Sequence, residues 1–257
     1  MESRVGFIGG GRITRIILKG LERAGAMPAD VVVSDPDAAK LHGLEKEFPC
    51  VAAGPNTAAA ACDIVFLSVP AAVMDAVLDG IKGALEPGSV LVSLVPGRRM
   101  SRISEMLGGF QRVVRMTPNA PSIVNSGYNP VAFSGALTQE EKGALKAVFE
   151  RLGACPEVPE EDLEAYSILT AIGPTYLWFQ LFELAGIATS LGLGPREVEQ
   201  GLAGMVTGTV ETMRKAGLTP AEVMDLVAIK PLGDEEERIK GLYRTRLVPL
   251  HERLKGA

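Results

Sequence analysis

The sequence has few residues of the kinds that build metal centres and disulfide frameworks. It contains 3 cysteines and 2 histidines in 257 residues. Cys50, Cys62 and Cys155 lie far apart without metal-ligand spacing, so we expect buried, reduced thiols. His42 and His251 are isolated, which excludes a histidine triad or a histidine metal cluster. We therefore expect no bound metal.

Basic charge is not in excess either. The chain has 26 lysine and arginine residues against 31 aspartate and glutamate residues, a formal net charge of -5. This balance gives no general attraction to nucleic acid or to an anionic membrane, so we expect neither as a partner. The first residues form a strand pattern rather than a basic and then apolar leader. We therefore expect no signal peptide and a cytoplasmic location.

One segment approaches the length of a membrane span. Residues 165–182 carry no charge, and a second uncharged run follows Glu183. Gly173 and Pro174 interrupt the first run, in which Thr, Ser and Gln recur. These features favour a helix buried in a subunit interface over a membrane span.

Short apolar runs alternate with helical segments over the first 155 residues. The runs are rich in β-branched residues and occupy residues 5–8, 31–33, 63–69, 89–94 and 112–116. Continuous apolar strands separated by helices indicate a parallel sheet covered on both faces. Parallel crossovers are right-handed and need long connections, so we predict a doubly wound α/β domain.

The remainder of the chain has a helical pattern. Helices are predicted at 139–152, 161–173, 174–191, 195–215, 220–227 and 235–254. Thr138 and Thr219 are candidate N-caps. Residues 153–162 hold two prolines and four acidic residues. We therefore predict a dinucleotide-binding domain at 1–155 and an all-helical domain at 156–257.

A glycine turn, IGGGRIT at residues 8–14, follows the first predicted strand. A dinucleotide-binding turn needs a glycine where the strand ends, a second beside the pyrophosphate, and a small residue where the helix packs. Gly9, Gly11 and Thr14 occupy these positions, with Thr14 an imperfect match. Arg12 and Ile13 begin the helix whose free N–H groups would face the phosphates. We predict a bound dinucleotide rather than an ordinary tight turn.

Asp35 ends the second predicted strand, where an acidic side chain can bind the ribose 2′-hydroxyl. Its carboxylate would repel the 2′-phosphate of NADP, whereas Arg12 or Lys40 can accommodate one. We therefore predict NADP or NAD as the cofactor, with NAD preferred. Asp35 and Asp37 form a ribose contact or a helix cap more readily than a metal pair.

Several stretches together resemble the pyrroline-5-carboxylate reductase family, in order and in spacing. They are VGFIGGGRITRIILKGL at 5–21, CDIVFLSVP at 62–70, RVVRMTPNAPSIVNSGYNPVAFS at 112–134 and ILTAIGPTYLWFQLFELAGIATSLGL at 168–193. The resemblance implies an N-terminal Rossmann domain and a C-terminal helical domain that interleaves with a partner subunit, as a homodimer or higher homo-oligomer. The implied reaction is NAD(P)H-dependent reduction of a small-molecule imine, with proline biosynthesis as the default role.

The resemblance also implies cofactor contacts. If the family geometry holds, Asn56, Val69, Pro70 and Asn119 line the cofactor cleft, with Asn119 near the nicotinamide. The family lysine between Val69 and Pro70 is absent here, and Thr117 replaces a family methionine. Taken alone, the segment around Asn119 is equally compatible with an ordinary turn.

The match fails where the family closes its substrate pocket with Ser-Pro-Gly-Gly-Thr-Thr. The equivalent here is IKPLGDEEE at 229–237. In one interpretation Gly233 and Asp234 bind substrate, while Glu235 binds a cationic imine or supplies its proton. In the other, these acids form a solvated helix start, where the helix dipole favours them. Lys230 is a third candidate, as proton donor or carboxylate anchor.

Thr170 stands where the family has a serine before Gly-Pro, and it is our second catalytic candidate beside Glu235. Two other functions remain open. A β-hydroxyacid-dehydrogenase-like carbonyl reductase shares the two-domain plan, but residues 165–182 lack the lysine that its chemistry usually needs. A cofactor-binding protein without a substrate pocket would not be an enzyme.

Overall fold

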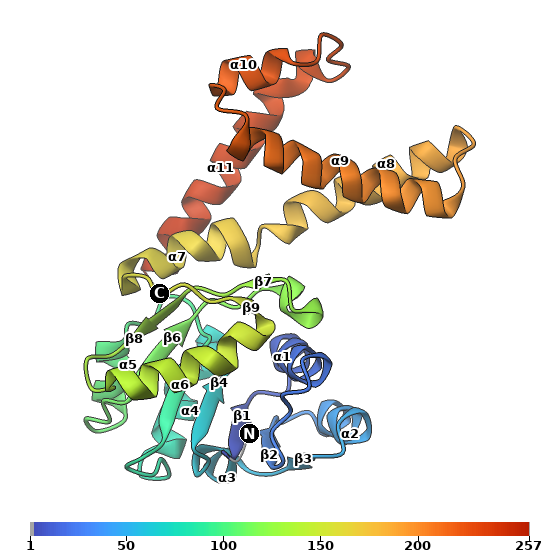
Figure 1. The fold of residues 1–257 in the computed structure, drawn as a ribbon. Coiled ribbons are helices and arrows are strands. Elements are labelled where there is room, and N and C mark those ends of the chain that lie inside the picture. Colours follow the sequence, from blue (N-terminus) through green and yellow to red (C-terminus); the bar gives the residue numbers. More distant parts are fainter. Residues whose placement is uncertain (1–2, 257) are drawn as a thin grey trace. The chain divides into compact units, whose positions relative to one another are not determined.

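The computed structural model describes residues 3–256, which fall into two compact units. The first unit runs to Ile172 and includes the last residues from Pro249, and the second is Gly173–Val248. Figure 1 shows that the sheet belongs to the first unit and that the second is helical. The first unit extends past the boundary that we placed at residue 155. Where the functional domains divide stays a prediction.

The first unit is built on a seven-stranded sheet with the order β3-β2-β1-β4-β5-β6-β8. Its parallel strands are β1 (Val5–Ile8), β2 (Val31–Ser34), β3 (Val51–Ala53), β4 (Ile64–Leu67), β5 (Val90–Ser93) and β6 (Val113–Met116). The edge strand β8 (Val131–Phe133) is antiparallel to β6. This topology confirms the predicted α/β Rossmann fold with its C-terminal helical region.

The helices that cover the sheet are α1 (Arg12–Arg23), α2 (Ala38–Glu47), α3 (Asn56–Ala60), α4 (Ala71–Ile81), α5 (Met100–Met106) and α6 (Gln139–Phe149). Neighbouring residues of β4 enter different cores, because side chains alternate across a strand. Phe66 packs with Phe7 and Phe149 in one core, and Leu67 packs with Leu78 in the other. Both faces of the sheet are therefore buried.

Four short strands escaped the sequence analysis. They are β3, β8, and the pair β7 (Gly127–Tyr128) and β9 (Gly153–Ala154), which form a separate two-stranded sheet. Segments of two or three residues are too short to display a period, so only long-range pairing defines them.

The three cysteines are free, and burial raises the pKa of the Cys155 thiol to about 12.

Short helical turns lead out of the sheet. They are η1 (Ala120–Val124), η2 (Glu150–Leu152), η3 (Glu160–Asp162), α7 (Leu163–Tyr166) and the π-helix η4 (Ser167–Ala171). The longer C-terminal helices are α8 (Pro174–Ser190), α9 (Pro195–Lys215), α10 (Pro220–Asp225) and α11 (Glu236–Lys255), with the turn η5 (Gly233–Glu235) before α11. Thr138 and Thr219 cap α6 and α10 through capping boxes, as predicted.

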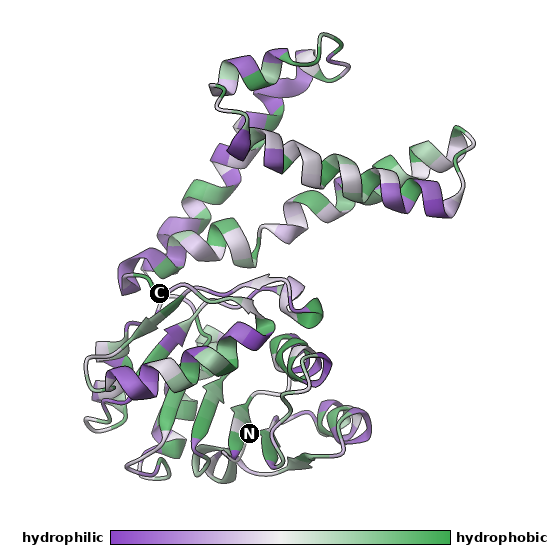
Figure 2. Ribbon diagram, in the orientation of Figure 1, coloured by the Kyte–Doolittle hydropathy of each residue, from purple (hydrophilic) through white to green (hydrophobic). Residues whose placement is uncertain are grey.

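The second unit has almost no buried side chains of its own. None of the described residues of α8 is buried, and Val198 is the one buried residue described in α9. Figure 2 shows hydrophobic residues recurring along both helices. Within residues 3–256, no helix is both long enough and apolar enough to cross a bilayer.

Candidate functional site

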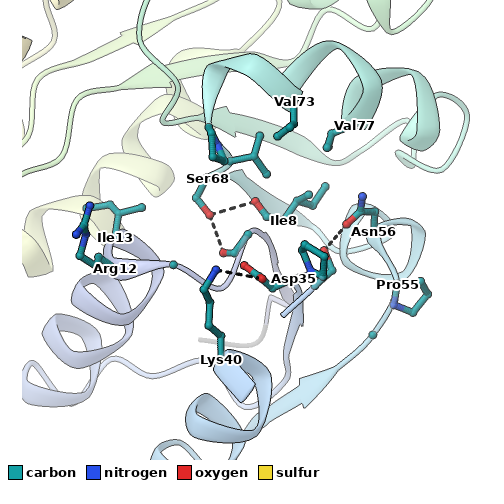
Figure 3. Close-up of a pocket in the computed structure, with 17 residues that line it drawn as sticks. Ile8, Arg12, Ile13, Asp35, Lys40, Pro55, Asn56, Ser68, Val73 and Val77 are labelled. Atoms are coloured by element: carbon teal, nitrogen blue, oxygen red, sulfur yellow. Dashed lines mark hydrogen bonds and ion pairs between the residues drawn. The ribbon is translucent and has the colours of Figure 1, made fainter. Parts of the chain in front are cut away.

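A cavity of about 860 Å³ opens at the carboxyl ends of β1, β2 and β4 (Figure 3). The chain order reverses between β1 and β4, so the connections after these strands run to opposite sides and leave a crevice. Such a switch point is where open α/β sheets bind their ligands. The cavity unites eight of the nine predicted cofactor contacts, which are Gly9, Gly11, Arg12, Ile13, Asp35, Asn56, Val69 and Pro70.

The two predicted glycines serve different needs. Gly9 has a φ of 109°, and a Cβ there would lie 2.5 Å from the Ser68 carbonyl oxygen, so the fold itself requires glycine. Gly11 is the N-cap of α1, and a Cβ there would meet nothing within 4 Å. The missing side chain at Gly11 therefore leaves open space where a pyrophosphate would approach the helix N-terminus.

Thr14 is better suited to its position than the sequence indicated. It is fully buried, and its hydroxyl donates to the Gly9 carbonyl oxygen at 2.5 Å. The same hydroxyl lies 2.9 Å from the Ser68 Oγ, which is itself 2.8 Å from the Gly9 carbonyl oxygen. Thr14 and Ser68 thus fix the glycine turn between β1 and β4. The sequence analysis missed Ser68, although it lies within the stretch CDIVFLSVP.

Asp35 links the glycine turn to the ribose side of the cavity. Its Oδ2 accepts from the Gly10 N–H at 2.9 Å, and its Oδ1 accepts from the Asp37 N–H at 2.9 Å and from Lys40 Nζ at 3.3 Å. Burial opposes ionisation, but these hydrogen bonds outweigh it and lower the pKa of the Asp35 carboxyl. The cavity therefore presents an ionised carboxylate with one lysine beside it. Asp37 caps α2 through the Ala39 N–H.

The wall beyond β4 is largely apolar. Val69, Pro70, Val73 and Val77 line the cavity there, at and after the end of the strand. Asn56 lies across the cavity, and its Oδ1 accepts from the Ser34 hydroxyl at 2.6 Å. An apolar wall opposite a few fixed polar groups suits a nucleotide with a flat ring at one end.

Asn119 and Thr170 lie outside the lining of this cavity. Asn119 is 7% exposed, and its Nδ2 donates to the Thr170 carbonyl oxygen at 3.2 Å. Its Oδ1 accepts from the Tyr128 N–H at 3.1 Å. The Thr170 hydroxyl donates to the Tyr166 carbonyl oxygen at 2.9 Å. Asn119 thus ties the loop after β6 to η4, and its contact with a nicotinamide stays a prediction.

Gly233, Asp234 and Glu235 form the turn η5 in the second unit. The Glu235 carboxylate is 49% exposed and pairs with Arg238, three residues along the chain. Glu236 and Glu237 pair with Lys240 in the first turns of α11. Within this unit the acids have the surroundings of a helix start, and their role toward substrate stays a prediction.

Comparison with known proteins covers nearly the whole chain. Residues 4–97 match the family model described as NADP oxidoreductase coenzyme F420-dependent. Pyrroline-5-carboxylate reductase of Synechocystis sp. is 30% identical over 233 residues, covering 88% of this chain and 85% of that protein. The enzyme of the same name from Escherichia coli is 27% identical over 244 residues, covering 94% and 90%.

Solved structures show the same fold. Pyrroline carboxylate reductase of Plasmodium falciparum with NADP bound superposes with a TM-score of 0.82 at 20% identity, covering 99% of this chain and 98% of that chain. Pyrroline-5-carboxylate reductase of Coxiella burnetii gives a TM-score of 0.70 at 25% identity, covering 99% and 95%.

Proposed function

This chain belongs to the pyrroline-5-carboxylate reductase family and is an NAD(P)-dependent oxidoreductase acting on a C=N bond, and we propose that its substrate is a small cyclic imine. Pyrroline-5-carboxylate, the substrate named for its relatives, is the first candidate. The observation that carries the proposal is the cavity at the switch point of the sheet, where the glycine turn, Asp35 and the apolar wall after β4 meet.

The reaction divides between the cofactor and the protein. When bound, NAD(P)H supplies a hydride to the imine carbon and leaves as NAD(P)⁺, while a proton reaches the imine nitrogen and the double bond becomes single. The turn from Gly9 to Gly11 would hold the pyrophosphate at the start of α1. Val69 and Pro70 would offer the nicotinamide end an apolar surface.

For the nucleotide, we propose a preference for NAD over NADP. The support is Asp35, whose carboxylate lines the cavity and stays ionised because of its hydrogen bonds. An ionised carboxylate accepts a bond from a ribose 2′-hydroxyl but repels a 2′-phosphate. Lys40 lies on the same wall and is the residue that would offset this repulsion.

For the proton, Glu235 is our first candidate and Thr170 our second, with Gly233 and Asp234 as substrate contacts. General acid catalysis contributes roughly 10² in rate or more, so Glu235→Gln should lower kcat by about 100-fold if Glu235 supplies the proton. Glu236→Gln is the matched control, because Glu236 is a neighbouring acid paired with Lys240. Equal rates for both variants would support a solvated helix start, and a loss in Lys230→Gln alone would move the role to Lys230.

For assembly, we propose a homodimer formed through the second unit. Its exposed side chains include Leu177, Phe179, Phe182 and Ile187 of α8. A groove of about 500 Å³ between α8 and α11 is lined mainly by apolar and aromatic residues, among them Tyr176 and Tyr243. Soluble monomers rarely expose contiguous apolar surface of this kind, so a second copy is its simplest cover.

The free cysteines support a reducing, cytoplasmic location.

A panel of cyclic imines, assayed by NADH and NADPH oxidation, tests the proposed function. Turnover of pyrroline-5-carboxylate would support proline formation. Turnover of another imine alone would indicate a changed substrate, which we would attribute to residues 229–237. Reduction of 3-oxo acids instead would favour the carbonyl reductase. Tight nucleotide binding without turnover of any compound would favour the protein that has lost its substrate pocket.

A further inference from the structure

A buried ionic cluster joins β6 to the segment that leaves the first unit. Arg115 on β6 donates from Nη1 to Glu160 Oε1 at 3.2 Å and from Nη2 to Glu164 Oε1 at 2.5 Å. The side chains of Arg115 and Glu164 are 4% and 7% exposed. The cluster therefore holds η3 and α7 against the sheet through a buried pair, Arg115 and Glu164, and a partly exposed carboxylate, Glu160.

The same two carboxylates also hold the loop after β5. Glu164 Oε1 accepts from the Gly97 N–H at 3.1 Å, and Glu160 Oε1 accepts from the Met100 N–H at 2.6 Å. Gly97 lies between β5 and α5, and Met100 begins α5. One arginine and two glutamates thus link β6, the segment formed by η3 and α7, and the loop between β5 and α5.

Glu164 also lies shortly before η4 in the chain. It lies on α7, which leads directly into η4, and the carbonyl of Thr170 in η4 accepts from Asn119. Arg115 therefore holds the segment before the π-helix through Glu164, and Asn119 holds the π-helix near its end through Thr170. A longer bond, from the Thr117 hydroxyl to the Leu163 carbonyl oxygen at 3.5 Å, adds a third link between the loop after β6 and α7.

The loops held by the cluster follow β5 and β6, the strands that come next in the sheet after β4, where the cofactor cavity ends. The cavity runs from Asp35 after β2, past Gly9 after β1, to Val69 after β4. With the ribose at Asp35, the nicotinamide end lies at β4, and the next strands in the sheet are β5 and β6. The loop at Gly97 follows β5, and the loop at Asn119 follows β6.

Stability alone explains the cluster poorly. Desolvation of a buried ion pair offsets much of its attraction, and well-packed apolar residues often do as well or better. Among the described residues, Arg115 Nε has no hydrogen-bond partner, so the network is not fully satisfied. A partly satisfied buried network costs stability. A geometry that the function requires is therefore a better reason for its presence than stability.

We propose that Arg115 and Glu164 are positioning residues for hydride transfer, setting the Gly97 loop and η4 against the nicotinamide end of the cavity. The proposal rests on the proposed imine reductase function. It requires that loosening the cluster slows the hydride step more than it weakens nucleotide binding, because Gly9, Gly11 and Asp35 lie outside the cluster.

The test compares Glu164→Gln and Arg115→Lys with Arg112→Gln in the full-length protein. Arg112 precedes β6 and pairs with Glu141 at 2.7 Å, so it is a matched ion pair at the opposite end of the same strand. The readouts are kcat, the nucleotide Kd, the thermal midpoint, and the deuterium isotope effect on kcat with nicotinamide deuterated at C4.

We expect kcat to fall by about tenfold in both cluster variants, since small misplacements of reacting groups slow transfer strongly. The isotope effect should rise because hydride transfer becomes more rate-limiting, while the nucleotide Kd stays within about twofold. Arg112→Gln should keep both kcat and the isotope effect. A wild-type isotope effect in active cluster variants, or an equal loss in Arg112→Gln, would overturn the positioning role. An inactive wild-type protein would instead overturn the proposed function, and the positioning role with it.

Discussion

The first unit buries apolar side chains on both faces of its sheet, whereas the second exposes most of its own. Phe7, Phe66 and Phe149 are at most 2% exposed, while Phe179 and Phe182 of α8 are 66% and 76% exposed. A unit with its own core can fix a cofactor cavity without help. A unit without one depends on contacts from elsewhere, and here it also carries Asp234 and Glu235, the residues that depart from the family motif.

The largest effect that we expect from a single change is at Gly11 in the first unit. Gly11→Val should raise the nucleotide Kd by about 100-fold or more, because the valine side chain would project where the pyrophosphate must approach the backbone. The fold should persist, since a Cβ there meets nothing within 4 Å. Fluorescence titration with NADH and thermal denaturation would measure both. Gly80→Val, which also has open space, is the control and should bind normally.

The next effect tests the second unit. Phe182→Glu should turn a dimer into a monomer by sedimentation velocity, because a charge would enter an apolar interface. Nucleotide binding by the first unit should change less than about twofold, since every residue that lines its cavity belongs to that unit. Phe182→Leu keeps the surface apolar and should remain a dimer. An unchanged dimer in Phe182→Glu would place the interface elsewhere.

A smaller effect concerns cofactor choice. Asp35→Ser should raise kcat/KM for NADPH relative to NADH by about tenfold, because the carboxylate that opposes a 2′-phosphate is removed. Asp37→Ser is the control, since Asp37 caps α2 and does not line the cavity. A wild-type protein that already prefers NADPH strongly would contradict the role that we give to Asp35.

The smallest effect is on acid stability of the first unit. Hydrogen bonds from Arg112 and then from Thr138 lower the pKa of Glu141 from 4.5 to about 2. Its folded pKa is depressed, so its stabilising contribution is present above pH 4.5 and is lost as the pH falls toward 2. Glu141→Gln should therefore flatten the fall of the thermal midpoint over this range, and Glu140→Gln should not. If the thermal midpoint fell equally steeply with pH in both variants, Glu141 would have no role in acid stability.

The sequence predicted the fold where the pattern was long enough to display a period. A clear apolar run in the sequence marks each of the strands β1, β2, β4, β5 and β6. The caps at Thr138 and Thr219 could be predicted because capping depends on the local side chain. The strands β3, β7, β8 and β9 are defined by pairing between distant segments. Their two or three residues carry too little local information to reveal this.

The site was predictable to a similar degree. The glycine turn and Asp35 are local motifs, and the structure brings them together with Val69 and Pro70 in one cavity. The bond between Arg115 and Glu164 joins residues 49 apart, and nothing in either segment indicates the other. Ser68 and Thr14 likewise meet only because β1 and β4 are neighbours.

The most direct test of the central claim is to follow deuterium from nicotinamide labelled at C4 into the reduced product by mass spectrometry. The wild-type protein and a cyclic imine should give a saturated amine with one deuterium on the former imine carbon, and Gly11→Val should give none. Saturable nucleotide binding with no label in any imine of the panel would contradict the claim.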